Sequence, residues 1–182
     1  MRKNPTSRPG GAGHVGGFCV PHTIQLTPDK GRGAFAETPI AEGTVVWRHV
    51  PGQYEVHDEP SFERLLSPMS REDVVYELDH VVILPELPEY VIRYLDDGAL
   101  INHSGTPNLA TNRPAGPPRV HRVASTREAE EVLLGDAFAI VATRAVEAGE
   151  ELTMDYESEE GGALPYYDAL CERYGLSWPW LS

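Results

Sequence analysis

The chain is poor in cysteine. Its 182 residues include only two, Cys19 and Cys171, too few for a disulfide framework or for a zinc site with four thiolate ligands. We expect both to be ordinary reduced side chains, as is usual in a reducing compartment. The seven histidines are scattered without a spacing such as HxH or HExxH, so the sequence predicts no metal site.

Long apolar runs are also missing. No stretch of the sequence approaches the about 20 apolar residues of a membrane-spanning helix. The basic residues near the N-terminus are not followed by the apolar segment of a signal peptide. We therefore expect no membrane contact and a cytoplasmic protein, or a nuclear one if the source is eukaryotic. The length suits a single packed core.

Positive charge is scarce. The chain carries 28 acidic and 15 basic side chains, and Lys3 and Lys30 are its only lysines. A net charge of −13 repels the phosphates of nucleic acids and favours basic partners. We expect no direct binding to nucleic acid. The acidity could equally serve solubility alone, so charge does not choose the partner.

The distribution of glycine, proline and apolar residues predicts one domain. Residues 1–17 are rich in Gly, Pro, Ser and Arg, and we interpret them as a disordered tail. Residues 18–160 form the predicted domain, and residues 161–182 form an aromatic-rich segment that closes it, with a helix over 164–175. Alternation and turn residues predict several short strands within the domain, at 22–26, 33–36, 43–47, 90–95, 99–103 and 137–143.

Helices are expected to be few. Residues 60–80 are predicted to be helical, and Ser70 to Asp73 has the form of a capping box. Many short strands, few helices and frequent Gly or Pro turns predict a mainly β fold with small helical inserts.

Three short motifs occur in a fixed order. Lys30 to Ala36 contains a Gly-x-Gly turn, residues 99–108 read ALINHSGTPN, and residues 149–156 read GEELTMDY. Together they resemble the GxG, NHSxxPN and GEELTxDY signatures of the SET-domain protein lysine methyltransferases. No cysteine-rich segment follows the last motif, so the resemblance is to a short stand-alone form.

This resemblance implies a fold and an activity. The fold would be the β-clip-like SET domain, with small curled sheets and a knot-like crossing of the NHS and DY segments. The activity would be transfer of a methyl group from S-adenosylmethionine to the side-chain amine of lysine in a basic protein or peptide. The alternative is a catalytically silent SET-like module that binds a cofactor or a peptide. The target protein, the number of methyl groups and the oligomeric state do not follow from the sequence.

The resemblance also assigns a cofactor site. Two glycines one residue apart let a backbone approach a ligand closely. The backbone of Gly31, Arg32 and Gly33 would cradle the methionine part of S-adenosylmethionine, and Asn102 and His103 would contact its amino-acid and adenine ends. An isolated Gly-x-Gly or Asn-His pair is usually structural, so these assignments depend on the combined spacing. Asn108 is expected to hold the crossing rather than to touch a ligand.

Tyr156 is the predicted catalytic residue, with its hydroxyl near the sulfonium and the lysine nitrogen. An apolar channel would lower the pKa of the lysine from about 10.4, so no strong general base is needed. Met154, Tyr54 and Trp178 are the candidate channel residues. Their alternatives are a core side chain for Met154, a surface or core ring for Tyr54, and helix packing for Trp178.

Two places depart from the family pattern: residues 99–100, and Met154, where many relatives carry an aromatic residue. Ala99 and Leu100 stand where many relatives have Arg-Phe, so an arginine contact is lost. Arg93 is the candidate substitute for that arginine. The lost arginine and Met154 favour the silent module, whereas Asn102, His103 and Tyr156 favour an enzyme and weigh more.

Overall fold

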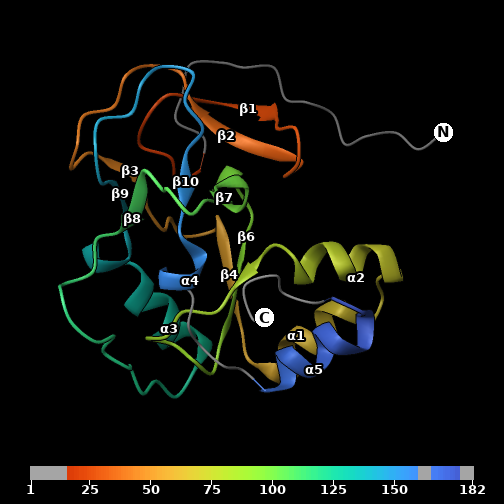
Figure 1. The fold of residues 1–182 in the computed structure, drawn as a ribbon. Coiled ribbons are helices and arrows are strands. Elements are labelled where there is room, and N and C mark those ends of the chain that lie inside the picture. The colour runs from red at the N-terminus through yellow and green to blue at the C-terminus, as the bar shows by residue number, and fades with distance from the viewer. Residues whose placement is uncertain (1–15, 160–164, 177–182) are drawn as a thin grey trace.

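The computed structural model describes residues 16–159 and 165–176. Most of its ordered elements are short strands (Figure 1): β1 (His22–Leu26), β2 (Arg32–Ala36), β3 (Val45–Trp47), β4 (Tyr54–His57), β5 (Val81–Val82), β6 (Val91–Tyr94), β7 (Asn102–His103), β8 (Leu109–Thr111), β9 (Ile140–Ala142) and β10 (Thr153–Met154). The helices are α1 (Glu59–Leu66), α2 (Arg71–Leu78), α3 (Thr126–Leu133), α4 (Tyr156–Glu159) and α5 (Pro165–Tyr174), with 3-10 helices η1 (Asp97–Leu100) and η2 (Asp136–Phe138).

The strands form several small sheets instead of one large sheet. Two sheets have three strands each, in the orders β3-β9-β8 and β4-β6-β5, and two are pairs, β1-β2 and β7-β10. Every pairing is antiparallel except that of β7 with β10, which is parallel. This architecture confirms the predicted mainly β fold with small helical inserts.

The β1-β2 hairpin places the Gly-x-Gly segment at its turn. The amide of Thr27 donates to the carbonyl oxygen of Gly31 at 2.7 Å, which closes the turn. Gly31 adopts a φ of +75°, a conformation that favours glycine. On β2, Ala34 and Ala36 are fully buried, which fixes the register of the hairpin on the core.

The NHS and DY segments lie side by side. In the parallel pair, Thr153 lies opposite Asn102 and Met154 lies opposite His103. The ladder continues beyond the strands, because the amide of Ser104 donates to the carbonyl of Met154 at 2.9 Å. The two segments that were expected to meet are therefore hydrogen-bonded side by side.

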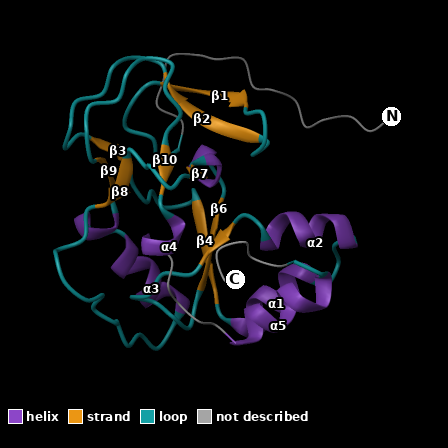
Figure 2. Ribbon diagram, in the orientation of Figure 1, coloured by secondary structure: helices purple, strands orange, loops and turns teal. Residues whose placement is uncertain are grey.

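Helices cover both sides of the β4-β6-β5 sheet (Figure 2). Helices α1, α2 and α5 pack together through a shared apolar cluster that includes Phe62, Leu78 and Tyr167. Helix α3 packs on β4 and β6 from the other side, through Ala129 and Leu133. The predicted helical region and the closing helix are confirmed, and the side chain of Ser70 caps α2 as expected.

Several local structures differ from the sequence prediction, among them Ala137 and Phe138, which were expected in a strand and belong to η2. Residues Ala99 and Leu100, expected in a strand, belong to the 3-10 helix η1. The side chain of Asp96 accepts from the amide of Gly98 at 2.9 Å, and this cap starts the helical turn. Helix α3 was not predicted, although the side chain of Ser125 caps it and the carboxylate of Glu128 accepts a hydrogen bond from the backbone amide of Ala124.

The first residues that the structure describes are hydrogen-bonded to the rest of the domain. Gly17, within the predicted tail, donates its amide to Asp96 at 2.5 Å, and its carbonyl accepts from Arg48. The rest of the tail, up to residue 15, lies outside the described residues. In the closing segment, residues 165–176 are described. Helix α5 ends at Tyr174 and is followed by Gly175, which has a φ of +75°. No helix in the described ranges is long and apolar enough to cross a bilayer.

The contact between α3 and the sheet offers a matched test of the core. Leu133 is 1% exposed and its neighbour Leu134 is 49% exposed. We expect Leu133→Ala to lower the free energy of unfolding by about 2–5 kcal/mol, because it opens a cavity between α3 and β4. Leu134→Ala should change it by about 0.5 kcal/mol or less. Urea denaturation measures both, and equal effects would contradict this packing.

Candidate functional site

The Gly-x-Gly turn and the NHS segment meet at Asn102. The side-chain amide of Asn102 donates to the carbonyl oxygen of Arg32 at 3.1 Å and to Oε1 of Glu151 at 2.8 Å. A Cβ atom on Gly33 would lie 2.7 Å from both Asn102 Nδ2 and Glu151 Oε1. Glycine at position 33 therefore allows the hairpin to approach the crossing this closely.

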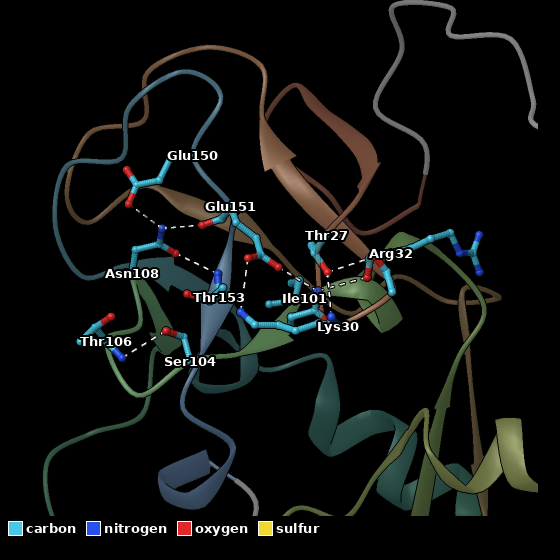
Figure 3. A network of polar contacts seen from close by, with 12 residues as sticks. Thr27, Lys30, Arg32, Ile101, Ser104, Thr106, Asn108, Glu150, Glu151 and Thr153 are labelled. Atoms are coloured by element: carbon cyan, nitrogen blue, oxygen red, sulfur yellow. Dashed lines mark hydrogen bonds and ion pairs between the residues drawn. The ribbon is translucent and has the colours of Figure 1, made fainter.

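A partly exposed ion pair lies beside this junction (Figure 3). Lys30 Nζ lies 3.3 Å from Oε2 of Glu151, and both side chains keep contact with solvent. The other carboxylate oxygen of Glu151 holds Asn102, so one residue of the DY segment joins both upstream motifs. The junction thus presents one positive and one negative group next to the open backbone at Gly31, where no atom would meet a Cβ within 4 Å.

Asn108 ties the crossing together from the inside. It is 1% exposed; its amide nitrogen donates to the carbonyl oxygen of Glu151 at 2.8 Å, and its Oδ1 accepts from the amide of Thr153 at 2.9 Å. The same nitrogen reaches Oε1 of Glu150 at 3.2 Å. The hydrogen bond from Arg144 is the main cause that lowers the pKa of Glu150 to about 2. The prediction that Asn108 holds the crossing is confirmed.

Tyr156 is held at both ends. Its backbone amide donates to Nδ1 of His103 at 3.2 Å, and its hydroxyl donates to the carbonyl oxygen of Ile101. The rings of His103 and Tyr156 are 5.6 Å apart. The structure therefore places Tyr156 against both His103 and the residue that precedes Asn102, and the predicted site residues of the NHS and DY segments come together.

A largely apolar cavity of about 70 Å³ begins at Tyr156. Ile101, which precedes β7, and Met154, which lies on β10, line it together with Tyr156. Farther along, the lining consists of Trp47, His49, Asp79, His80, Val81, Val82, Leu84, Tyr94, Gly98, Ala99, Thr111, Phe138 and Ile140. This volume is roughly five times what a single water molecule needs, so it suits a slender chain of a few heavy atoms.

His49 is the most buried polar residue of the cavity wall. It is 6% exposed, and aromatic rings surround it: Trp47 at 4.7 Å, Tyr54 at 4.9 Å and Tyr94 at 5.7 Å between ring centroids. Burial lowers the pKa of His49 from 6.5 to about 4, and hydrogen bonding to the Phe138 backbone offsets only part of this shift. The ring is therefore neutral at pH 7.

The candidate channel residues occupy different places. Met154 lines the cavity. Tyr54 is not among the lining residues: its ring packs on His49, and its hydroxyl donates to the carbonyl of Glu130 at 3.3 Å. Trp178 lies outside the described residues. Arg93, the candidate substitute for the missing arginine, is bound instead to Glu77 at 2.6 Å and to Glu55 at 3.1 Å.

Other residues of the site were not assigned a role from the sequence. Lys30 and Glu151 lie inside the motifs, so the motifs signalled their position but not their pairing. His49 lies in no motif, and only the fold shows that it faces the same cavity as Tyr156. Across the described part of the chain, no group of three His, Cys, Asp or Glu side chains could hold a metal ion.

The hydrogen bonds of Asn108 generate a stability prediction. Asn108→Ala leaves the amide of Thr153 and the carbonyl of Glu151 without their buried partner, which should lower the free energy of unfolding by about 2–4 kcal/mol. Asn112→Ala is the matched control, because Asn112 is exposed and its side chain makes a 3.3 Å bond to the carbonyl of Asp136. Similar losses in the two variants would contradict the role of Asn108 in the crossing.

The neutral state of His49 generates a pH prediction. Between pH 4 and pH 6.5 the unfolded chain binds a proton at His49 that the folded chain does not, so the stability contribution present above pH 6.5 is lost as the pH falls. From pH 7 to pH 5 this loss should be about 2 kcal/mol. In His49→Phe this part of the acid sensitivity should disappear. Denaturation curves of both proteins at the two pH values measure it, and parallel losses would contradict the prediction.

Comparison with known proteins bears directly on these motifs. Residues 31–157 match the model of the SET domain family, which is well over half of the chain. A search among curated proteins found no match. Since the family match spans the Gly-x-Gly turn, the NHS segment and the DY segment whose contacts build this site, the chain belongs to the SET domain family.

Proposed function

We propose that this protein transfers a methyl group from S-adenosylmethionine to the side-chain amine of lysine in a basic protein or peptide. SET domains are typically protein lysine methyltransferases, and membership of the family supports this class of activity. The observation that carries the proposal is the position of Tyr156. Its ring lines an apolar cavity, and its backbone is bonded to His103, next to the junction of Asn102 with the Gly-x-Gly turn.

The polar junction fits the amino-acid part of the cofactor. That part carries an ammonium and a carboxylate, and the junction offers Glu151 and Lys30 as charges of opposite sign. Gly31 leaves its backbone accessible at the same place. Gly31, Arg32, Gly33, Asn102 and His103 would hold the cofactor, with Lys30 and Glu151 added to the residues that the motifs assign. When bound, S-adenosylmethionine supplies a methyl group activated by a positively charged sulfur.

The cavity fits the lysine. Its mostly apolar walls would contact the alkyl chain of the lysine and disfavour the ammonium, which lowers the pKa of the amine and makes the nucleophile available. Asp79 in the lining and the net charge of −13 favour a basic partner. Transfer forms the N–C bond as the S–C bond breaks, and the amine proton leaves to solvent.

Tyr156 would orient the reacting groups. Its hydroxyl donates its proton to the carbonyl of Ile101, so the lone pairs of the phenol oxygen remain available as acceptors. Such an oxygen can hold a polarised methyl group by weak C–H···O contacts. Together with the fixed backbone of Tyr156 this aligns nitrogen, carbon and sulfur, and positioning of this kind can supply roughly 7–11 kcal/mol of a barrier.

Replacing Tyr156 with phenylalanine tests the proposal. We expect Tyr156→Phe to lower methyl transfer by about 100-fold or more, since it removes one preorganised polar contact at the reacting atoms. Cofactor affinity, measured by calorimetry, should change by less than about threefold, because the variant keeps the junction with Lys30 and Glu151. Transfer is followed with a radiolabelled methyl donor on lysine-rich proteins and peptides.

Tyr90→Phe is the matched control. Its hydroxyl also donates to a backbone carbonyl, that of Val123 at 3.4 Å, but Tyr90 does not line the cavity. This variant should keep full activity. Full activity in Tyr156→Phe would refute the assignment. Cofactor binding without any transfer, including to proteins of a lysate analysed by mass spectrometry with a heavy-methyl donor, would favour the silent binding module.

A further inference from the structure

The N-terminal tail of the chain joins the domain beside the cavity. The amide of Gly17 donates to Oδ2 of Asp96 at 2.5 Å, and the indole nitrogen of Trp47 donates to the same oxygen at 3.1 Å. Gly17 packs so closely on this indole that a Cβ atom there would lie 2.5 Å from Trp47 Nε1. Trp47 lines the cavity, and so does Gly98, whose amide Asp96 also binds. Residues 1–15 therefore precede a point of the chain that is fixed against the cavity wall.

The tail and the domain carry opposite charges. Residues 1–15 contain no acidic residue, although the whole chain has a net charge of −13. The basic residues of the tail are Arg2, Lys3 and Arg8. Near Gly17, the carboxylate of Asp97 is 45% exposed. Asp79, which lines the cavity, is 59% exposed, so the cavity meets solvent beside a negative charge that attracts a basic segment.

The length of the tail is sufficient for it to return to the cavity. Lys3 stands 14 residues before Gly17, and a chain of that length spans at most roughly 50 Å. A domain of this size has a radius of gyration of only about 15 Å. Lys3 can therefore reach the cavity while Gly17 keeps its contacts with Trp47 and Asp96.

Lys3 is also the lysine of this chain that suits the cavity. The only other lysine is Lys30. Its Nζ lies 3.3 Å from Oε2 of Glu151, whose other carboxylate oxygen binds Asn102 on the polar side of the strand pair. The cavity lies on the opposite side, where Met154 contributes to its lining. Lys30 is thus occupied at the junction that we assign to the cofactor.

We propose that Lys3 of the chain's own tail enters the cavity and is methylated there by the same molecule. The chemistry of this step rests on the proposed function, whereas the occupancy of the cavity does not. The lone pair of the neutral Lys3 Nζ forms the new N–C bond. The S–C bond of the methyl donor breaks with its electron pair left on sulfur, and the extra proton on nitrogen leaves to solvent.

Occupancy of the cavity is measured on the full chain without a methyl donor. Met154 lines the cavity, whereas Met69 packs against the cluster of α1, α2 and α5. In protein labelled with ¹³C-methyl methionine, Lys3→Ala should shift the Met154 resonance and leave the Met69 resonance in place. Arg8→Ala is the matched control, because it removes the same charge from the tail but keeps Lys3. Equal effects of the two variants on Met154, or none in Lys3→Ala, would overturn the inference.

Methyl transfer to Lys3 is measured by mass spectrometry of the intact chain and of its peptides. After incubation with S-adenosylmethionine, the protein should carry methyl groups at Lys3, and Lys3→Arg should carry none. Mixing about 1 μM protein with an equal amount of Tyr156→Phe identifies the donor of the tail. The protein's own tail has an effective concentration on the order of 1 mM, so Tyr156→Phe should be modified at least about tenfold less. Equal modification of the two chains would overturn the inference in favour of a second copy as substrate.

The outcomes separate this inference from the proposed function. If added lysine-rich proteins receive methyl groups and Lys3 does not, the inference fails and the proposed function stands. If Lys3→Ala shifts the Met154 resonance but no protein receives a methyl group, the proposed function fails, and methylation of Lys3 fails with it, while the tail remains the occupant of the cavity. A shift at Met154 together with methyl groups at Lys3 of the same molecule supports both.

Discussion

The site depends on one buried interaction, the hydrogen bonding of Asn108 with the backbone of the DY segment. Asn108 bonds the carbonyl of Glu151 and the amide of Thr153, and it thereby fixes a parallel pair of strands that is only two residues long. A pair so short has few ladder bonds of its own, and an asparagine can supply both a donor and an acceptor. This contact reinforces the backbone bond from Ser104 to Met154 in fixing the register in which Asn102 faces Thr153 and His103 faces Met154.

This register places Ile101 and Asn102 on opposite faces of the pair. Successive side chains of a strand point in opposite directions. Ile101 and Met154 therefore line the apolar cavity, while Asn102, beside Ile101 in the sequence, joins Arg32 and Glu151 on the polar side. A charged ligand needs polar surroundings and an alkyl chain needs apolar ones, and this one pair of strands supplies both. Tyr156, the second residue after Met154, lies between the polar junction and the apolar cavity.

Local sequence signals predicted much of this arrangement and failed where distant contacts decide. The strand at His22–Leu26, the cap at Ser70 and the closing helix depend on neighbouring residues, and all were predicted. The strand expected at Ala99–His103 forms only at Asn102 and His103. Its first part is a 3-10 turn instead, because Asp96 caps that turn while also accepting from Gly17 and Trp47, two residues far away in the sequence. The three motifs located Asn102, His103 and Tyr156. No spacing in the sequence indicates that His49 and Tyr156 line one cavity, because only the folded chain brings the segment after β3 close to the pair of β7 and β10.

The charge state of the buried His49 matters at the site independently of the net charge of the protein. The protein as a whole carries a net charge of −13, which draws basic partners towards it from a distance. At the cavity wall a fixed positive charge would be unfavourable, because a protonated His49 would repel an approaching ammonium at short range. The aromatic rings of Trp47, Tyr54 and Tyr94 meet this requirement by excluding water, and exclusion of water keeps the imidazole neutral. The same rings that make the cavity apolar therefore keep the imidazole of His49 neutral.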